Sequence, residues 1–176
     1  DNGFKEVVIT GVNIGRYDHE GLTFENVVEK VLELPGDFRV RISSLEPDGF
    51  SDDFHKLFSH PKLAPHLHLC LQSGSDKILK QMRRMYSTSS FMEILESFWK
   101  HFPDFNFTTD LIVGFPGETD EDFQATADLV KQARYKNCYK CNNSQHFFCL
   151  NFFSVASESK KASPSIMFRM FSTSDR

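Results

Sequence analysis

The chain has few cysteines and little excess charge of either sign, and both shortages narrow the possible functions. Its 176 residues contain four cysteines, one isolated and three near the end, which does not resemble a disulfide framework and favours a reducing compartment. Twenty lysine and arginine residues against 24 aspartate and glutamate residues give a net charge of −4. The chain therefore lacks the strong overall attraction to nucleic acid that a basic domain has, although a local basic patch stays possible.

Long apolar runs and familiar catalytic arrangements are also missing. No apolar run reaches the roughly 18 residues of a membrane span and no signal peptide is visible, so we expect a cytoplasmic protein without membrane association. There is no P-loop, no carboxylate pair and no Ser–His–Asp arrangement, so the chemistry would have to come from a cofactor. The chain begins with Asp1 and its first methionine is Met82, from which we expect an internal piece of a longer protein.

The most informative stretch present runs from Leu67 to Tyr86. Leucines at every second position over residues 67–71 predict a buried strand, and apolar residues at helical spacing over 78–85 predict a helix. The polar turn Gln72-Ser73-Gly74-Ser75-Asp76 joins them and offers a helix cap. Turns of this kind bind ligands in parallel α/β folds, because strand ends and helix N-termini present unpaired amides.

The same succession of strand, polar turn and helix occurs four times. The other expected strands cover residues 5–10, 38–42 and 107–113, and the other expected helices cover 24–32, 51–59, 90–101 and 119–133. Thr23 would open the first of these helices, and capping boxes at Ser90–Glu93 and Thr119–Asp122 would start the last two. Four such units predict an α/β fold, a partial (β/α) barrel over residues 1–133, because eight units need about 250 residues. Residues 134–176 are expected to form an irregular tail with one strand-like run at 146–155.

The carboxyl ends of such strands share one rim, where ligands bind. The turn Ser43-Ser44-Leu45-Glu46-Pro47 offers two hydroxyls and a carboxylate, which suit ribose hydroxyls or an ammonium group. Gln72 and Ser73 are neutral hydrogen-bonding groups, and Gly114-Phe115-Pro116-Gly117 would let a flat ring lie against the backbone. Each turn also has a purely structural interpretation. Residues 43–47 could be a helix cap with a surface glutamate, and residues 114–117 could be a plain tight turn.

Four motifs, in order, resemble the radical-SAM methylthiotransferases that modify tRNA. They are Thr10-Gly11-Val12-Asn13-Ile14-Gly15, Arg41-Ile42-Ser43-Ser44-Leu45-Glu46-Pro47, Leu71-Gln72-Ser73-Gly74-Ser75-Asp76 with Met82-Arg83-Arg84-Met85-Tyr86, and Thr109-Asp110-Leu111-Ile112-Val113-Gly114-Phe115-Pro116-Gly117-Glu118-Thr119. The resemblance covers about residues 6–123. Pro65-His66-Leu67-His68-Leu69 and Pro35-Gly36-Asp37-Phe38-Arg39 are most similar to the branch that acts on N6-threonylcarbamoyladenosine in tRNA.

This resemblance implies a partial barrel of the radical-SAM type that binds S-adenosylmethionine and a 4Fe-4S cluster and inserts a methylthio group into a modified adenosine. tRNA would be the substrate, with no obligate protein partner. The cluster motif Cys-x3-Cys-x2-Cys is expected upstream of this chain, so the segment alone should not turn over. The implied cofactor contacts are Gly11 and Asn13 at the methionine end, Ser43, Ser44 and Glu46 at its polar groups, Gln72 and Ser73 at the ribose, and Val113, Gly114, Phe115 and Pro116 at the adenine.

Two other functions stay open: a non-catalytic remnant that binds a nucleotide or a partner chain, and a (β/α) barrel segment with another ligand. The basic helix side formed by Lys77, Lys80, Arg83 and Arg84 is either solvated or in contact with RNA phosphates. Cys70 is expected to be buried and structural, and the scattered histidines suggest no site. In the tail, Cys138, Cys141, His146 and Cys149 approach a zinc-knuckle spacing, but the final interval is too short and the glycines are missing, so zinc is the weaker reading.

Overall fold

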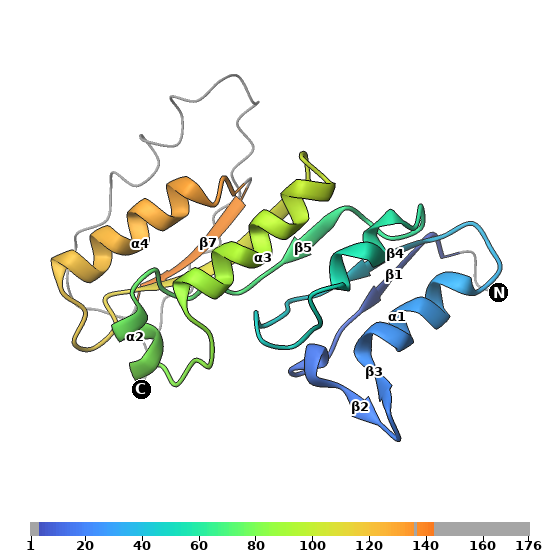
Figure 1. Cartoon of the computed structure of the whole chain (residues 1–176), viewed down its shortest axis with the longest axis horizontal. Helices are drawn as coiled ribbons and strands as arrows, with labels where there is room; N and C mark the ends of the chain where they lie inside the picture. Colours follow the sequence, from blue (N-terminus) through green and yellow to red (C-terminus); the bar gives the residue numbers. More distant parts are fainter. Residues whose placement is uncertain (1–3, 136, 143–176) are drawn as a thin grey trace.

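Five parallel strands form the frame of the molecule. The computed structural model describes residues 4–135, and the course of the backbone over residues 137–142. The strands are β1 (Glu6–Ile9), β4 (Arg39–Ile42), β5 (His66–His68), β6 (Asn106–Val113) and β7 (Asn137–Asn142). β1 pairs with β4, and β6 lies between β5 and β7, all in parallel. Isolated parallel bridges from Val40 to Leu63 and from Leu45 to Leu69 join the two ladders, which gives the order β1-β4-β5-β6-β7. Figure 1 shows β1 and β4 toward one end of the molecule and β7 toward the other.

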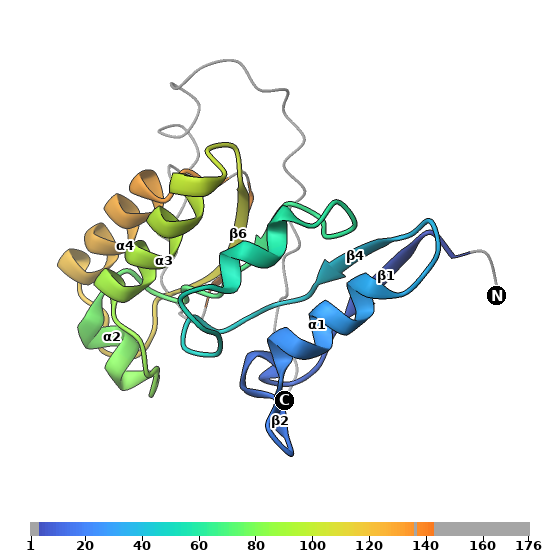
Figure 2. The ribbon, with the colours of Figure 1, turned by 45° about the vertical axis from the view of Figure 1, so that its right-hand side comes forward.

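Helices connect these strands and lie along one face of them. They are α1 (Phe24–Glu33), the 3-10 helix η2 (Phe54–Ser59), α2 (Asp76–Gln81), α3 (Thr88–His101) and α4 (Asp120–Gln132). A further 3-10 turn, η1 (Ile14–Arg16), and a small antiparallel pair, β2 (Asp18–His19) and β3 (Leu22–Thr23), lie between β1 and α1. Figures 1 and 2 show α1, α3 and α4 on the same side of the strands.

The core lies between that helical layer and the strands. Phe24, Val28 and Leu32 occur at every fourth position of α1, so they face the sheet together and all three are buried. A cluster of aromatic rings fills the space between η2, α3 and β6. The ring of Phe98 lies 4.7 Å from that of Phe105 and 5.3 Å from that of Phe107, measured between centroids. Edge-to-face and tilted pairs at these distances stabilise the core beyond the burial of their area.

The predicted α/β architecture with four βα units is confirmed, and so are the capping residues of two helices. The Thr23 hydroxyl accepts the Asn26 N–H at the start of α1, and the Thr119 hydroxyl accepts the Asp122 N–H at the start of α4. The expected start of α3 was wrong by a few residues. Ser87, and not Ser90, caps this helix, because its hydroxyl accepts the Ser90 N–H at 3.2 Å.

Other elements differ from those expected from the sequence, or lie outside the residues that the structure describes. The predicted second helix is the 3-10 helix η2, and the strands β2, β3 and β7 were not predicted. Cys138 and Cys141 belong to β7, whereas His146, Cys149 and the strand-like run at 146–155 lie outside the described residues. The part of the chain that the structure describes has no helix with the length and apolarity to cross a bilayer.

Candidate functional site

The carboxyl ends of β1, β4, β5 and β6 lie side by side along one edge of the sheet. We call this edge the rim and define it by residues 11–13, 43–46, 72–73 and 113–116. Backbone hydrogen bonds connect neighbouring strand ends there, from Ser43 N–H to Ile9 O (3.0 Å), from Cys70 N–H to Leu45 O (3.0 Å) and from Gln72 N–H to Asp110 O (2.9 Å). The predicted site segments therefore belong to one continuous surface.

Three rim residues hold left-handed backbone conformations within four residues of the ends of their strands. The φ angles are 50° at Asn13, 65° at Gln72 and 74° at Gly114. A left-handed non-glycine residue costs about 1–2 kcal/mol, and such strain concentrates at ligand sites because the surroundings must impose it. Gln72 is held by one edge of β6, since its N–H donates to the Asp110 carbonyl and its own carbonyl accepts the Ile112 N–H at 2.8 Å.

The predicted contact residues differ in exposure. Gly11, Asn13, Ser44 and Pro116 are exposed, and Ser43, Glu46, Val113, Gly114 and Phe115 are half-buried. Gln72 and Ser73 are buried. The side chain of Ser73 points away from the rim: its hydroxyl lies 3.4 Å from the Thr126 hydroxyl of α4 and accepts the Ser75 N–H at 3.2 Å. The arrangement gives Ser73 a structural role, and we leave it out of the ligand contacts proposed below.

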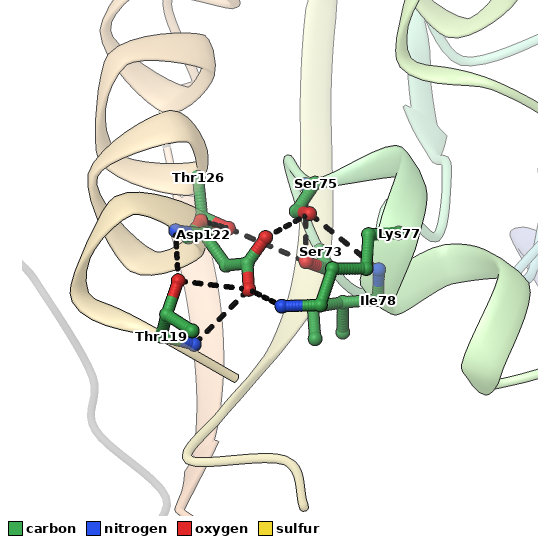
Figure 3. A network of polar contacts seen from close by, with 7 residues as sticks. All are labelled: Ser73, Ser75, Lys77, Ile78, Thr119, Asp122 and Thr126. Atoms are coloured by element: carbon green, nitrogen blue, oxygen red, sulfur yellow. Dashed lines mark hydrogen bonds and ion pairs between the residues drawn. The ribbon is translucent and has the colours of Figure 1, made fainter. Parts of the chain in front are cut away.

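A buried polar network fastens the turn after β5 to helix α4 (Figure 3). The Ser75 hydroxyl donates to Asp122 at 2.7 Å, and the Lys77 ammonium approaches the other carboxylate oxygen at 2.6 Å. The Lys77 ion pair and the Ser75 hydrogen bond hold the pKa of the Asp122 carboxyl well below its usual range. This network fixes the position of the adjacent rim residue Gln72.

Glu46 is paired with an arginine that sequence reasoning had assigned to a basic helix side. Arg84 Nη1 lies 2.8 Å from Glu46 Oε1, and both side chains keep less than a third of their exposure. Arg84 Nε is buried and has no hydrogen-bond partner within the described residues. An acceptor on a ligand, such as a carboxylate, would satisfy this N–H group. Of the same helix side, Lys77 pairs with Asp122 instead, and Lys80 and Arg83 are exposed.

The turn after β6 is closed by its own glutamate. The Gly114 N–H donates to a carboxylate oxygen of Glu118 in a short contact. Burial raises the pKa of Glu118, an effect that the hydrogen bonds from Gly114 and Phe115 oppose. The loop 114–118 is therefore held in a compact form beside the end of β6. A fixed loop of this kind is suited to pack against a flat ring of a ligand.

Below the rim, polar side chains cover the sheet face opposite to the helices. We call this the polar face and define it by Glu6, Arg41, His66, His68, Thr108 and Asp110. His66 Nε2 and His68 Nδ1 lie 3.1 Å and 2.9 Å from the Thr108 hydroxyl, and His68 Nε2 lies 3.3 Å from Asp110 Oδ2. Arg41 pairs with Glu6 at 3.4 Å. Burial, with Arg41 and His68 nearby, lowers the pKa of His66.

This face was not predicted, because the histidines are scattered in the sequence and no site was expected among them. The missed signal is the alternation in His66-Leu67-His68-Leu69-Cys70. A central strand of an ordinary barrel is apolar on both sides. In this segment the leucines alternate with polar side chains, which therefore lie on the opposite face of the strand. Cys70 is buried as predicted, and burial together with the carboxylates of Asp110 and Glu46 raises the pKa of its thiol to about 12.

The parallel order, the helices on one face and the strained rim define an incomplete (β/α) barrel with its ligand edge at the carboxyl ends of the strands. The family model described as "Radical SAM superfamily" matches residues 1–130, so the chain belongs to that superfamily. Two solved structures share the fold. Coproporphyrinogen III oxidase from Escherichia coli, a radical SAM enzyme, has a TM-score of 0.56 at 16% identity, over 75% of this chain and 30% of that one. A radical S-adenosylmethionine methyltransferase from Kitasatospora setae has a TM-score of 0.54 at 13% identity, over 66% of this chain and 23% of that one.

Similar curated proteins carry more specific names. A threonylcarbamoyladenosine tRNA methylthiotransferase from Thermotoga maritima is 45% identical over 139 residues, which are 78% of this chain and 32% of the relative. A tRNA-2-methylthio-N(6)-dimethylallyladenosine synthase from Endomicrobium trichonymphae is 40% identical over 139 residues, 78% of this chain and 33% of the relative. The chain thus spans about a third of the length of these relatives. The resemblance to radical-SAM tRNA methylthiotransferases found in the motifs is confirmed.

The residues present fit one of the two cofactors that this family implies. The rim offers a half-buried carboxylate at Glu46, an unsatisfied N–H at Arg84 and the compact loop 114–118, which suit the ammonium, carboxylate and adenine of S-adenosylmethionine. A 4Fe-4S cluster needs several thiolates. Within residues 4–135, Cys70 is the single cysteine, so these residues do not form a cluster site.

Proposed function

We propose that this chain forms the cofactor-binding part of a radical-SAM methylthiotransferase that inserts a methylthio group into N6-threonylcarbamoyladenosine of tRNA. The observation that carries the proposal is the 45% identity over 139 residues with the threonylcarbamoyladenosine-specific relative. The joined rim, in which all four predicted segments meet, supports it independently. S-adenosylmethionine, when bound at the rim, would supply the radical chemistry, and a 4Fe-4S cluster would need ligands other than the described residues.

In this proposal, different rim residues contact different parts of S-adenosylmethionine. Gly11 and Asn13 approach the methionine end, Ser43, Ser44 and Glu46 bind its polar groups, Gln72 faces the ribose, and Val113, Gly114, Phe115 and Pro116 flank the adenine. Arg84 adds a function that the motif did not suggest. It orients the Glu46 carboxylate through Nη1, and its Nε–H is directed to an acceptor on the ligand. The residues act by binding and orienting, and the reactive groups belong to the cofactor.

A chimeric enzyme tests this proposal. The segment of the Thermotoga maritima relative that aligns with this chain is replaced by the aligned 139 residues, and the chimera is incubated with tRNA carrying threonylcarbamoyladenosine. We expect methylthiolated nucleoside in the tRNA digest by mass spectrometry. The control chimera carries Gly114→Val, which forces a branched side chain into a left-handed position at φ 74° and should abolish the product.

The other outcomes are equally informative. If the chimera made product only on tRNA that carries dimethylallyladenosine, the proposed nucleoside would be wrong, but the proposed methylthiolation would stand. A folded chimera that binds S-adenosylmethionine but makes no product, beside an active parent, would favour the alternative of a non-catalytic nucleotide-binding remnant.

A further inference from the structure

We propose that His68, Cys70 and Asp110 form a binding site for a divalent transition-metal ion of the zinc class on the polar face. One ligand atom from each residue lies within 4.8 Å of the other two. The three side chains come from the same face of adjacent strands, because His68 and Cys70 are two residues apart and Asp110 lies on the neighbouring strand β6. None of these three residues is among the S-adenosylmethionine contacts proposed above, although Cys70 lies near Glu46.

The spacing already present fits a tetrahedral ion. His68 Nε2 and Asp110 Oδ2 are 3.3 Å apart. Zinc–nitrogen and zinc–oxygen bonds of about 2.0–2.1 Å in a tetrahedron place two such ligands roughly 3.3–3.4 Å apart. The ion would lie between these two atoms, and Cys70 Sγ, within 4.8 Å of both, would supply the third ligand.

A supporting hydrogen bond orients the imidazole for this role. His68 Nδ1 lies 2.9 Å from the Thr108 hydroxyl, and the same hydroxyl lies 3.1 Å from His66 Nε2. The Thr108 hydroxyl can accept Nδ1–H from His68 at this distance. That leaves Nε2 of His68 as the atom that meets the ion. Metal-bound histidines regularly have such a partner on their second nitrogen.

The donor set selects the class of metal. Magnesium and calcium ions take oxygen ligands, whereas one nitrogen, one sulfur and one oxygen suit zinc and its neighbours. A thiolate and a carboxylate neutralise the charge of a divalent ion, and the thiol proton leaves to solvent on binding. Cys70 is 6% exposed, and the Asp110 side chain is 39% exposed. The ion is thus reached from one side, and three protein ligands leave a fourth position for water or a substrate atom.

Cobalt(II) is the probe for the test, because thiolate coordination gives an intense charge-transfer band and a tetrahedral site gives strong visible bands. The protein is the 176-residue chain with Cys138, Cys141 and Cys149 replaced by serine, which leaves Cys70 as its one thiol. We expect one equivalent of cobalt with both signatures, displaced by one equivalent of zinc. Absence of the bands in a sample folded by circular dichroism would overturn the proposal.

Variants assign the ligands. Cys70→Ala should remove the charge-transfer band, and Asp110→Asn, at a half-exposed position that does not threaten the core, should weaken binding at least tenfold. Thr108→Val should weaken it by about 10–100-fold, the usual effect of losing the partner of a metal-bound histidine. Asp104→Asn, exposed and not part of the cluster, is the matched control and should bind as the parent does. Unchanged cobalt affinity in Asp110→Asn would show that the ion binds elsewhere.

Discussion

The backbone N–H of Gly74 donates to the Thr126 hydroxyl at 2.9 Å, which joins the turn after β5 directly to helix α4. A Cβ atom at position 74 would lie 2.4 Å from Thr126 Cα and 2.8 Å from the Ala125 carbonyl oxygen. Both neighbours are backbone atoms of a helix, which cannot move aside as a flexible side chain can. The absence of a side chain at Gly74 is therefore what lets the turn and the helix approach.

Replacing Gly74 by alanine should destabilise the fold by about 3 kcal/mol, at the upper end of overpacking costs, because the added methyl group must push α4 away. Urea unfolding followed by circular dichroism measures the change. Gly21→Ala is the control: its φ of 78° adds the left-handed strain of about 1 kcal/mol, but nothing lies within 4 Å of the new Cβ. Equal losses in the two variants would contradict the close approach at Gly74.

Thr126→Val should lower the free energy of unfolding by about 1–3 kcal/mol. Valine has the shape of threonine without its hydroxyl, so the Gly74 N–H would stay buried without an acceptor. Thr126→Ser keeps the hydroxyl and loses one methyl group, and about 1 kcal/mol is expected for it. Serine behaving worse than valine would show that packing, and not the hydrogen bond, holds the turn.

Local sequence rules predicted most of the frame, because the strands, the helix periodicity and the caps at Thr23 and Thr119 depend on residues close in sequence. The motif segments also meet at one edge, since the ends of the strands in a parallel sheet lie side by side. What failed depends on contacts between distant residues. The burial of Ser73 against Thr126 and the pairing of Arg84 with Glu46 join positions 53 and 38 residues apart, and no local pattern encodes them. β7 escaped prediction because its pairing with β6 stabilises a segment of polar composition.

The Asp122 carboxylate should make the stability of the chain depend on pH in the acid range. Its pKa in the folded state is lowered by Lys77 and Ser75 below the value of about 3.9 that an unfolded aspartate has. The stabilisation is therefore complete above pH 4 and is lost as the pH falls through the lower folded value. Urea midpoints between pH 7 and pH 2 should drop less steeply for Asp122→Asn than for the parent. Asp120→Asn, in the same helical turn, should retain the steep drop, and parallel curves for all three would contradict the Asp122 assignment.

Substitutions at Ser73 and Glu46 should have different effects, although the sequence motifs assign both residues to S-adenosylmethionine. We expect the first to lower stability and the second to weaken cofactor binding. Ser73→Ala removes a buried hydroxyl that contacts α4, so we expect a loss of about 1 kcal/mol in stability and an affinity within about twofold of the parent. Glu46→Gln keeps the shape of a half-buried rim side chain but removes its charge. Losing a charge-assisted hydrogen bond of about 1.5–3 kcal/mol corresponds to roughly tenfold or greater weakening of S-adenosylmethionine binding. Calorimetric titration of both variants measures the affinities, and urea unfolding measures the stabilities. If Ser73→Ala weakened binding more than Glu46→Gln, the cofactor would reach into the turn beside α4, and Glu46 would not be its main polar contact.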